Sequence, residues 1–245
     1  MEFVIEPKNG IWVAVKPGVK LPEYLDRIKN ADVLAADIDD TIAPSPAKRI
    51  AFSKLKDIRF LASPKFMMWG FNTCLDLAVK GKAAESDAWK DFIELFLRDP
   101  AEQDKIRRQY TPEFARSTFY PSVADFYARL PLYMKKFFVT RNIREVGEAY
   151  LEAAGFNELL PEQFDKRGSL DMILLMQPEA RRFLVQGDSE EDQEFLERLE
   201  LKKKIGRLHQ VTSIYVSGSP YSLNPAFDIN IGRDYTGLVK LLQAC

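Results

Sequence analysis

The chain has 245 residues, of which 46% are hydrophobic and 29% charged, and its formal net charge is −1. These values are typical of a soluble globular protein with one large domain, or with a core domain and an inserted module. The balanced charge gives no general indication of nucleic-acid binding. The longest strongly apolar run covers only residues 66–71, whereas a membrane-spanning helix needs roughly 20 residues.

Two further features bear on the compartment in which the protein works. Residues 1–10 lack the basic and apolar regions of a secretory signal peptide. Cys74 and Cys245 are the only cysteines, too few and too scattered for a disulfide framework or a thiolate metal site. We therefore expect a cytoplasmic protein without stable membrane insertion.

Strands and helices are predicted to alternate on both sides of a long helical region. Before that region the sequence predicts a strand over residues 11–15, a helix over 22–28 and a buried strand over 33–37. After it we expect strands over 136–140, 182–186 and 211–216, and helices over 121–130, 143–154, 169–176 and 190–203. This alternation predicts a parallel sheet with right-handed crossovers and helices on both faces.

Residues 44–118 differ from the segments around them. Leu, Phe, Met, Ala, Lys and Glu recur there at helical spacing, and no convincing strand is present. We therefore expect an α/β core formed by residues 1–42 and 119–245, with an all-helical insert over residues 43–118. The predicted fold class is α/β, with a Rossmann-like parallel sheet and the insert placed after the strand at 33–37.

The first part of the insert is rich in basic and aromatic side chains. Only Asp57 opposes the positive charges of Lys48, Arg49, Lys54, Lys56, Arg59 and Lys65, and Phe52, Phe60, Phe66 and Trp69 interleave with them. A packed helix with solvated lysines would explain this pattern, as would a surface that attracts an anionic substrate or an anionic lipid. The apolar run at residues 66–69 is expected where the insert meets the core.

Residues 33–42 are the most informative stretch of the chain. Four apolar residues are followed by Asp37, Asp39, Asp40 and Thr41, and open α/β sheets place their ligand sites at such strand ends. Neighbouring carboxylates repel each other, and a divalent cation is the natural compensation. The alternative is that the acids cap a following helix, although one cap needs only one acid.

Polar residues also follow two later strands. Thr140, Arg141 and Asn142 follow the strand at 136–140, and Gly187-Asp188 follows the strand at 182–186. Each has an ordinary explanation when taken singly, since strand-end hydroxyls and Gly-Asp turns are common. If these strands neighbour the strand at 33–37 in one parallel sheet, their ends converge on one edge.

In the order of these residues, the sequence resembles the haloacid dehalogenase (HAD) superfamily of phosphatases and phosphotransferases. That family's first motif, an apolar strand followed by Asp-x-Asp-x-Thr/Val, is met by Asp37, Asp39 and Thr41. Its second motif, an apolar strand ending in Thr or Ser, is met by Thr140. Tyr120 begins a stretch similar to the family's helix before that motif.

The third and fourth motifs of the family lie nearer the C-terminus. Lys166 fits the third motif, a lysine, although Arg167 is adjacent and a solvated lysine is a common alternative. The fourth motif is an apolar strand followed by an acidic pair, and Asp188 and Asp192 meet it. The resemblance covers residues 31–216.

The resemblance implies a Mg²⁺-dependent phosphatase. Asp37 would attack phosphorus and form an aspartyl-phosphate, while Asp39 would protonate the leaving oxygen and later activate water. The implied metal ligands are the Asp37 carboxylate, the Asp39 backbone carbonyl and Asp188, with Asp192 in support. The resemblance implies that the phosphoryl group is bound by four residues: Thr140, Arg141, Asn142 and Lys166.

The resemblance also makes residues 43–118 a type-one cap, a helical lid that confers specificity. The expected partner is a small-molecule phosphate ester, nucleic acid is not expected, and the oligomeric state is left open. One alternative is a phosphotransferase or mutase that uses the same aspartyl-phosphate, and another is a non-catalytic binding protein with this fold. Asp39 argues against dehalogenation, because dehalogenating relatives lack an acid there.

Overall fold

The computed structural model describes residues 1–245 except 19, 82, 141–142, 157, 161–165 and 245. The described residues form one sheet of eight strands in the order β1-β2-β8-β7-β6-β3-β4-β5. The strands are β1 (Glu2–Lys8), β2 (Ile11–Val15), β3 (Val33–Ala36), β4 (Lys135–Val139), β5 (Glu158–Leu160), β6 (Arg182–Gly187), β7 (Gln210–Ser217) and β8 (Ile229–Gly232).

The sheet combines a parallel body with an antiparallel edge. The strands from β8 to β5 in this order pair in parallel with one another, whereas β2 pairs antiparallel with both β1 and β8. The predicted α/β class is confirmed. The sequence did not predict the antiparallel edge, because β1 and β8 carry no clear strand pattern.

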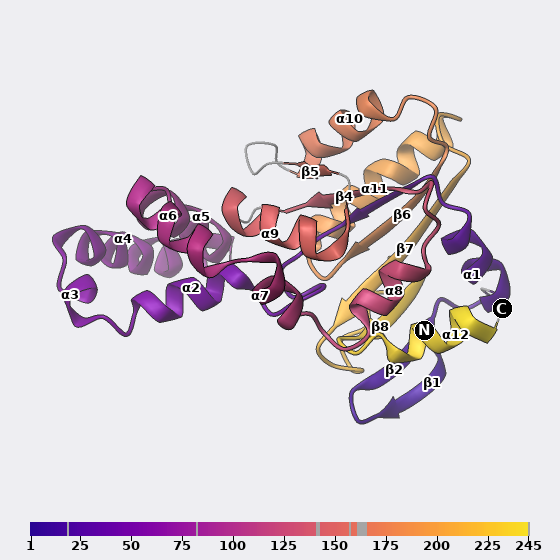
Figure 1. Cartoon of the computed structure of the whole chain (residues 1–245), viewed down its shortest axis with the longest axis horizontal. Helices are drawn as coiled ribbons and strands as arrows, with labels where there is room; N and C mark the ends of the chain where they lie inside the picture. Colours follow the sequence, from indigo (N-terminus) through magenta and orange to yellow (C-terminus); the bar gives the residue numbers. More distant parts are fainter. Residues whose placement is uncertain (19, 82, 141–142, 157, 161–165, 245) are drawn as a thin grey trace.

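Helices cover both faces of the sheet (Figure 1). The helices of one face are α1 (Leu21–Lys29), α8 (Val123–Arg129), α9 (Arg144–Ala154) and α12 (Thr236–Ala244), and those of the other are α10 (Lys166–Met176) and α11 (Glu190–Lys204). Successive strand residues point to opposite faces. In β3, Leu34 and Ala36 join the first cluster while Val33 and Ala35 join the second, so this strand is buried on both sides.

Between β3 and β4 the chain leaves the sheet and forms a separate group of helices (Figure 1). These helices are α2 (Pro46–Lys54), α3 (Ile58–Leu61), α4 (Pro64–Lys80), α5 (Ala83–Phe96), α6 (Pro100–Gln109) and α7 (Pro112–Ser117). Local sequence explains their starts, because Ser45, Asp57, Ser63, Asp99 and Thr111 each cap a helix with a side-chain oxygen. We call residues 43–118 the cap; its exact limits stay a prediction.

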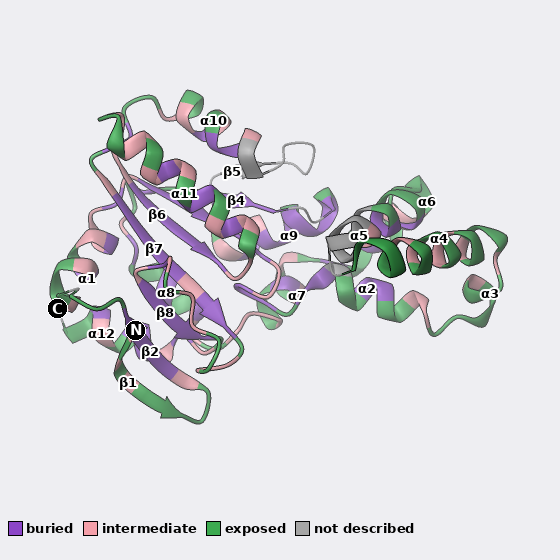
Figure 2. Cartoon of the chain, turned by 180° about the vertical axis from the view of Figure 1, so that it is seen from behind, coloured by how far each residue is buried: buried purple, intermediate pink, exposed green. Residues whose placement is uncertain are grey.

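The cap has a small aromatic centre of its own. Phe60, Phe66, Trp69, Phe92 and Phe96 make ring contacts with centroid distances between 4.9 and 6.2 Å. The expectation that residues 66–69 lie where the cap meets the core is therefore wrong: the rings of this run contact α3 and α5. Figure 2 shows the surrounding cap helices largely exposed and the strands largely buried.

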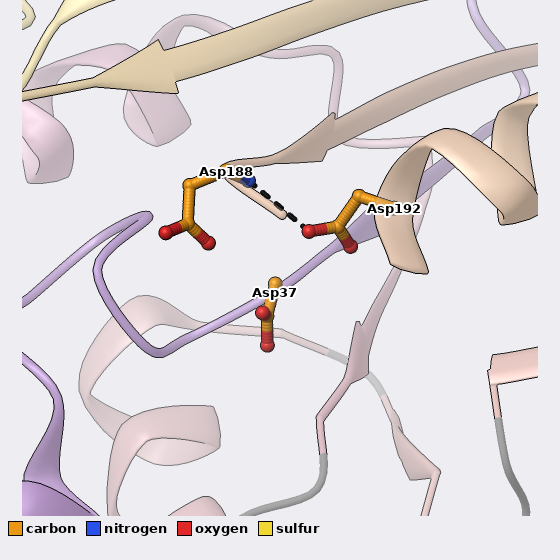
Figure 3. Close-up of side chains that lie close together, drawn as sticks. All are labelled: Asp37, Asp188 and Asp192. Carbon is orange, nitrogen blue, oxygen red and sulfur yellow. Dashed lines mark hydrogen bonds between the residues drawn. The ribbon is translucent and has the colours of Figure 1, made fainter. Parts of the chain in front are cut away.

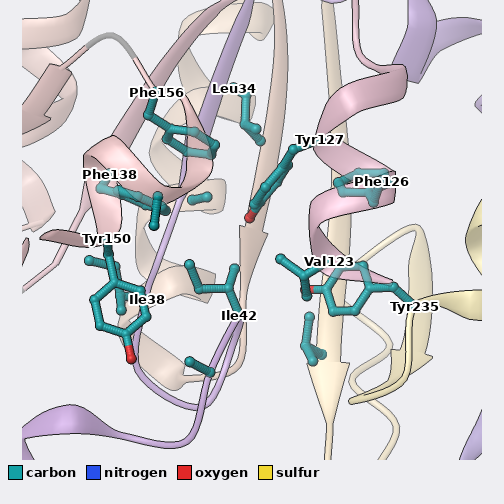
Figure 4. Close-up of a cluster of buried hydrophobic side chains, with 14 of the residues drawn as sticks. Leu34, Ile38, Ile42, Val123, Phe126, Tyr127, Phe138, Tyr150, Phe156 and Tyr235 are labelled. Atoms are coloured by element: carbon teal, nitrogen blue, oxygen red, sulfur yellow. The ribbon is translucent and has the colours of Figure 1, made fainter. Parts of the chain in front are cut away.

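The two connections between core and cap lie side by side. The backbone N–H of Tyr120, where the chain returns from the cap, donates to the carbonyl oxygen of Ile42 at 2.8 Å. Ile38 and Ile42 are fully buried in the cluster that includes Tyr127 and Tyr150 (Figure 4). The turn that follows β3 is thus anchored by its apolar residues.

None of the described helices has the combination of length and apolar character needed to cross a membrane.

Candidate active site

Three strand ends bring the predicted site residues to one edge of the sheet. Asp37 follows β3, Thr140 follows β4 and Asp188 follows β6. Since β3 is the parallel neighbour of both β4 and β6, the carboxyl ends of all three strands lie together. The structure therefore gathers these residues as expected, while their chemical roles stay predictions.

Asp37 is held at the start of the turn by contacts with the neighbouring backbone. Its own N–H donates to the carbonyl oxygen of Gln186 in β6 at 3.0 Å, and its Oδ1 accepts from the N–H of Ile38 at 2.7 Å. The residue is 7% exposed. These two hydrogen bonds fix the Asp37 side chain at the start of the turn.

Three carboxylates form a group that suits a divalent cation. Asp37, Asp188 and Asp192 each offer one oxygen, and these oxygens lie within 4.8 Å of one another (Figure 3). Asp37 and Asp192 are buried and Asp188 is partly exposed. Grouped negative charges are unfavourable without compensation, and hard oxygen donors are the ligands that Mg²⁺ prefers. The residues present therefore fit the metal that the sequence predicts.

Asp192 also orders the loop that carries Asp188. Its Oδ2 accepts from the backbone N–H groups of Asp188 and Ser189, both at 3.1 Å, and from the hydroxyl of Ser189 at 2.6 Å. Ser189 and Asp192 form a capping box at the start of α11. A Cβ on Gly187 would lie 2.1 Å from Cγ of Asp192, so this close approach requires glycine.

Asp39 is contacted from both the cap and the core. Its Oδ1 accepts from the hydroxyl of Ser45 at 2.5 Å, and its Oδ2 accepts from the hydroxyl of Thr140 at 3.5 Å. Ser45 is also the N-cap residue of α2 and accepts from the N–H of Lys48 at 3.3 Å. Ser45 is not among the site residues predicted from the sequence. Its place before Pro46 identifies a helix start, but its contact with Asp39 depends on the tertiary path.

Asp40 occupies the sharpest part of the turn. Its φ is 54°, a left-handed conformation that Asp tolerates better than most residues. Its carboxylate also accepts from Lys48 at 3.0 Å, from Arg233 at 3.2 Å and from the hydroxyl of Tyr120 at 3.4 Å. These contacts, which join the cap, the return connection and the end of β8, were not predicted.

The carboxylates at this edge of the core affect the pKa values of Lys48 in the cap and Tyr120 at the return connection. Partial burial lowers the pKa of Lys48, but the hydrogen bond and charge of Asp40, with the charges of Asp188 and Asp39, raise it overall. Burial raises the pKa of Tyr120, and the nearby carboxylate of Asp40 adds to the effect. Lys48 therefore stays protonated and Tyr120 stays a neutral hydrogen-bond donor at physiological pH.

A network of side-chain hydrogen bonds around Gln186 contacts the turn that follows β3. The hydroxyl of Tyr235 donates to the carbonyl oxygen of Thr41 at 3.0 Å and contacts the side-chain amide of Gln186. The hydroxyl of Tyr127 donates to Oε1 of Gln186 at 3.0 Å. Thr41 in turn donates through its hydroxyl to Oδ1 of Asp188 at 3.1 Å. Because buried hydrogen bonds are costly to break, this network fixes the turn relative to β6.

Some predicted site residues cannot be placed. Arg141 and Asn142 lie outside the described residues. Lys166 begins α10, but its side chain and that of Arg167 also lie outside the described part. The choice between these two cations for the third motif therefore stays a prediction.

No family model and no curated protein sequence matches this chain. Among solved structures, cytosolic 5'-nucleotidase IIIB bound to cytidine matches with a TM-score of 0.59 and 12% identity, over 97% of this chain and 94% of that one. A haloacid dehalogenase-like hydrolase from Burkholderia xenovorans LB400 matches with a TM-score of 0.51 and 16% identity, over 87% and 98% of the two chains. The chain has the HAD fold. At these identities the likeness extends to the fold and no further.

Proposed function

We propose that this HAD-fold protein is a Mg²⁺-dependent phosphatase that hydrolyses a small-molecule phosphomonoester through an aspartyl-phosphate. The observation that carries the proposal is the group of carboxylate oxygens from Asp37, Asp188 and Asp192 within 4.8 Å of one another. Asp39 lies two residues from Asp37 and has separate hydrogen-bond partners. The site thus offers a metal-binding group beside a second, differently held acid.

The chain's own residues would perform the reaction in two steps. The Asp37 carboxylate would attack the phosphorus in line and form the acyl phosphate, while Asp39 donates a proton to the departing oxygen. Asp39 would then remove a proton from the water that hydrolyses the intermediate. Ser45 and Thr140 hold the Asp39 carboxyl group from two sides, which favours one orientation for both transfers.

The metal would be held by the Asp37 carboxylate, the Asp39 backbone carbonyl and Asp188, with Asp192 ordering the loop. When bound, Mg²⁺ would offset the negative charge of the nucleophile and the phosphate. Thr140, Arg141, Asn142 and Lys166 are proposed to bind the phosphoryl oxygens. Residues 43–118 would close over the site and exclude water, and the proposed location is the cytoplasm.

The decisive experiment compares the wild type with Asp37→Asn on a generic aryl phosphate and a phosphomonoester panel, with Mg²⁺ and with a chelator. Nucleoside monophosphates come first in the panel, because a 5'-nucleotidase is among the structural neighbours and matches over 97% of this chain. We expect Mg²⁺-dependent hydrolysis that Asp37→Asn lowers by roughly 10⁴-fold. Asp171→Asn, at a 65% exposed side chain on α10, is the matched control and should keep full activity.

Two results would contradict the proposal. One is the absence of metal-dependent hydrolysis across the panel, and the other is an Asp37→Asn variant as active as the wild type. Calorimetric titration with Mg²⁺ gives a readout independent of turnover, and Asp188→Asn should weaken binding by at least about tenfold. Transfer of the phosphoryl group to an added alcohol in preference to water would favour the phosphotransferase alternative.

A further inference from the structure

The first helix of the cap directs a cation at the acidic edge of the core. Lys48 lies in the first turn of α2 and pairs with Asp40 at 3.0 Å, with 51% of its side chain exposed. Asp188 and Asp39 lie close enough for their charges to act on it. A positive charge on the cap therefore faces the candidate metal and acid/base residues on the core.

Other cations of α2 have partners within the cap. The guanidinium of Arg49 lies over the ring of Phe114, with 5.5 Å to its centroid, and Lys54 pairs with Glu102 at 2.7 Å. Among these three basic residues of α2, Lys48 is the one with an ion pair to the core. This separates it from the general basic character of residues 48–65.

Asp40 does not depend on Lys48 for compensation. Arg233, from the loop after β8, pairs with the same carboxylate at 3.2 Å, and Tyr120 donates to it at 3.4 Å. Asp40 is 19% exposed and Lys48 51%, and a partly exposed pair of this kind contributes little to stability. Lys48 can therefore leave without exposing Asp40 to the penalty of an uncompensated, largely buried charge.

We propose that Lys48 binds the phosphoryl group of the substrate and that Asp40 holds this lysine while the site is empty of substrate. The inference rests on the proposed function. A phosphate monoester carries up to two negative charges near pH 7, whereas Asp40 carries one and shares it with Arg233. The substrate thus competes well for the ammonium group, and the exchange draws the first turn of α2 toward the site.

The test compares Lys48→Met with Lys48→Arg and with Lys54→Met, which removes another paired lysine of the same helix. We measure KM and kcat on the best substrate of the panel, and the affinity for inorganic phosphate by calorimetry with Mg²⁺ present. Lys48→Met should weaken phosphate binding and raise KM by about tenfold, the loss of one charge-assisted hydrogen bond. Lys48→Arg should recover most of that loss, and Lys54→Met should match the wild type.

Asp40→Asn separates this role from a merely structural ion pair. Asn tolerates the left-handed conformation of residue 40, so the turn should persist. The ion pair between residue 40 and Lys48 is lost, and Lys48 is held less strongly. The exchange predicts tighter phosphate binding in Asp40→Asn and weaker binding in Lys48→Met. If both variants weaken binding, or if Lys48→Met binds phosphate like the wild type, the inference is wrong, even where the wild type is an active phosphatase. If the wild type hydrolyses no ester of the panel, the proposed function fails, and phosphate affinity still decides the role of Lys48.

Discussion

The core and the cap of this molecule are stabilised in different ways. All four residues of β3 are buried, whereas all seventeen residues of α4, each of them described, are at least partly exposed. The candidate chemical groups belong to the core, where buried hydrogen bonds fix the turn after β3. The cap reaches them through Ser45 and Lys48. The comparison indicates that rigid packing positions the acids, while the loosely packed part makes contacts that can be exchanged.

The largest expected difference concerns two phenylalanines. Phe126 in α8 is 0% exposed and Phe71 in α4 is 65% exposed. Truncation of a fully buried phenylalanine removes its burial and leaves a cavity, so Phe126→Ala should lower the free energy of unfolding by about 4 kcal/mol. Phe71→Ala should change it by no more than about 0.5 kcal/mol. Urea denaturation followed by circular dichroism measures both, and similar losses would refute the contrast.

The next difference concerns two carboxylates and depends on pH. Burial raises the pKa of Asp32, but hydrogen bonds from the Arg182 side chain and from the N–H groups of Arg181 and Arg182 hold it below its usual 3.8. A lowered pKa gives stability that is complete above 3.8 and is lost as the pH falls through the folded-state value. Asp32→Asn should therefore cost about 1.5 kcal/mol at pH 7, and this cost should shrink below pH 3.8.

Glu102 in the cap is the carboxylate to compare with Asp32 in the same measurement. Burial raises the pKa of Glu102, and hydrogen bonds from Lys105 and Lys54 lower it by more. These are partly exposed pairs between side chains, so Glu102→Gln should cost only about 0.5 kcal/mol at pH 7. Unfolding curves recorded from pH 7 down to about pH 2 test both variants. A larger loss for Glu102→Gln than for Asp32→Asn would reverse the expected order.

The last comparison concerns the junction of the two parts, where the two variants should differ in kcat and not in stability. Ser45→Ala removes the N-cap of α2 and the hydroxyl that Asp39 accepts from. We expect a loss of about 1 kcal/mol of stability and a drop in kcat of about fivefold, equivalent to one hydrogen bond of about 1 kcal/mol. Ser63→Ala removes the N-cap side chain of α4. It should lower stability by a similar amount and leave kcat unchanged. If Ser63→Ala lowers kcat as much as Ser45→Ala does, the stability of residues 43–118 sets the rate, and the hydrogen bond to Asp39 does not.

Local signals explain which parts of the fold the sequence predicts. The strands at 33–36 and 182–187 each contain an apolar run and are followed directly by an acid, Asp37 or Asp188, and this pattern is visible without tertiary information. The strand β8 is short and contains Asn230, which is fully buried because it exchanges hydrogen bonds with the backbone of Asn224. A polar residue in so short a run gives no strand signal.

The candidate site also has a part that local sequence predicts and a part that it does not. Asp37, Asp39, Thr140 and Asp188 stand next to predicted strand ends, and the sheet order brings them together. The partners of Asp40 come from elements distant in sequence, and Arg233 lies in the loop after β8, a strand that the sequence does not predict. Contacts of this kind depend on the path of the whole chain, and no local pattern encodes them.

The hydrogen bond from Tyr120 to Ile42 has a consequence for the evolution and engineering of the chain. The polypeptide leaves the sheet and returns to it at neighbouring points, so the core requires only that residues 43–119 begin and end close together. The entropic cost of closing such an excursion grows slowly with its length. The segment between these points can therefore be lengthened, shortened or exchanged while the acidic edge keeps its geometry, so that one α/β scaffold can carry different inserted segments.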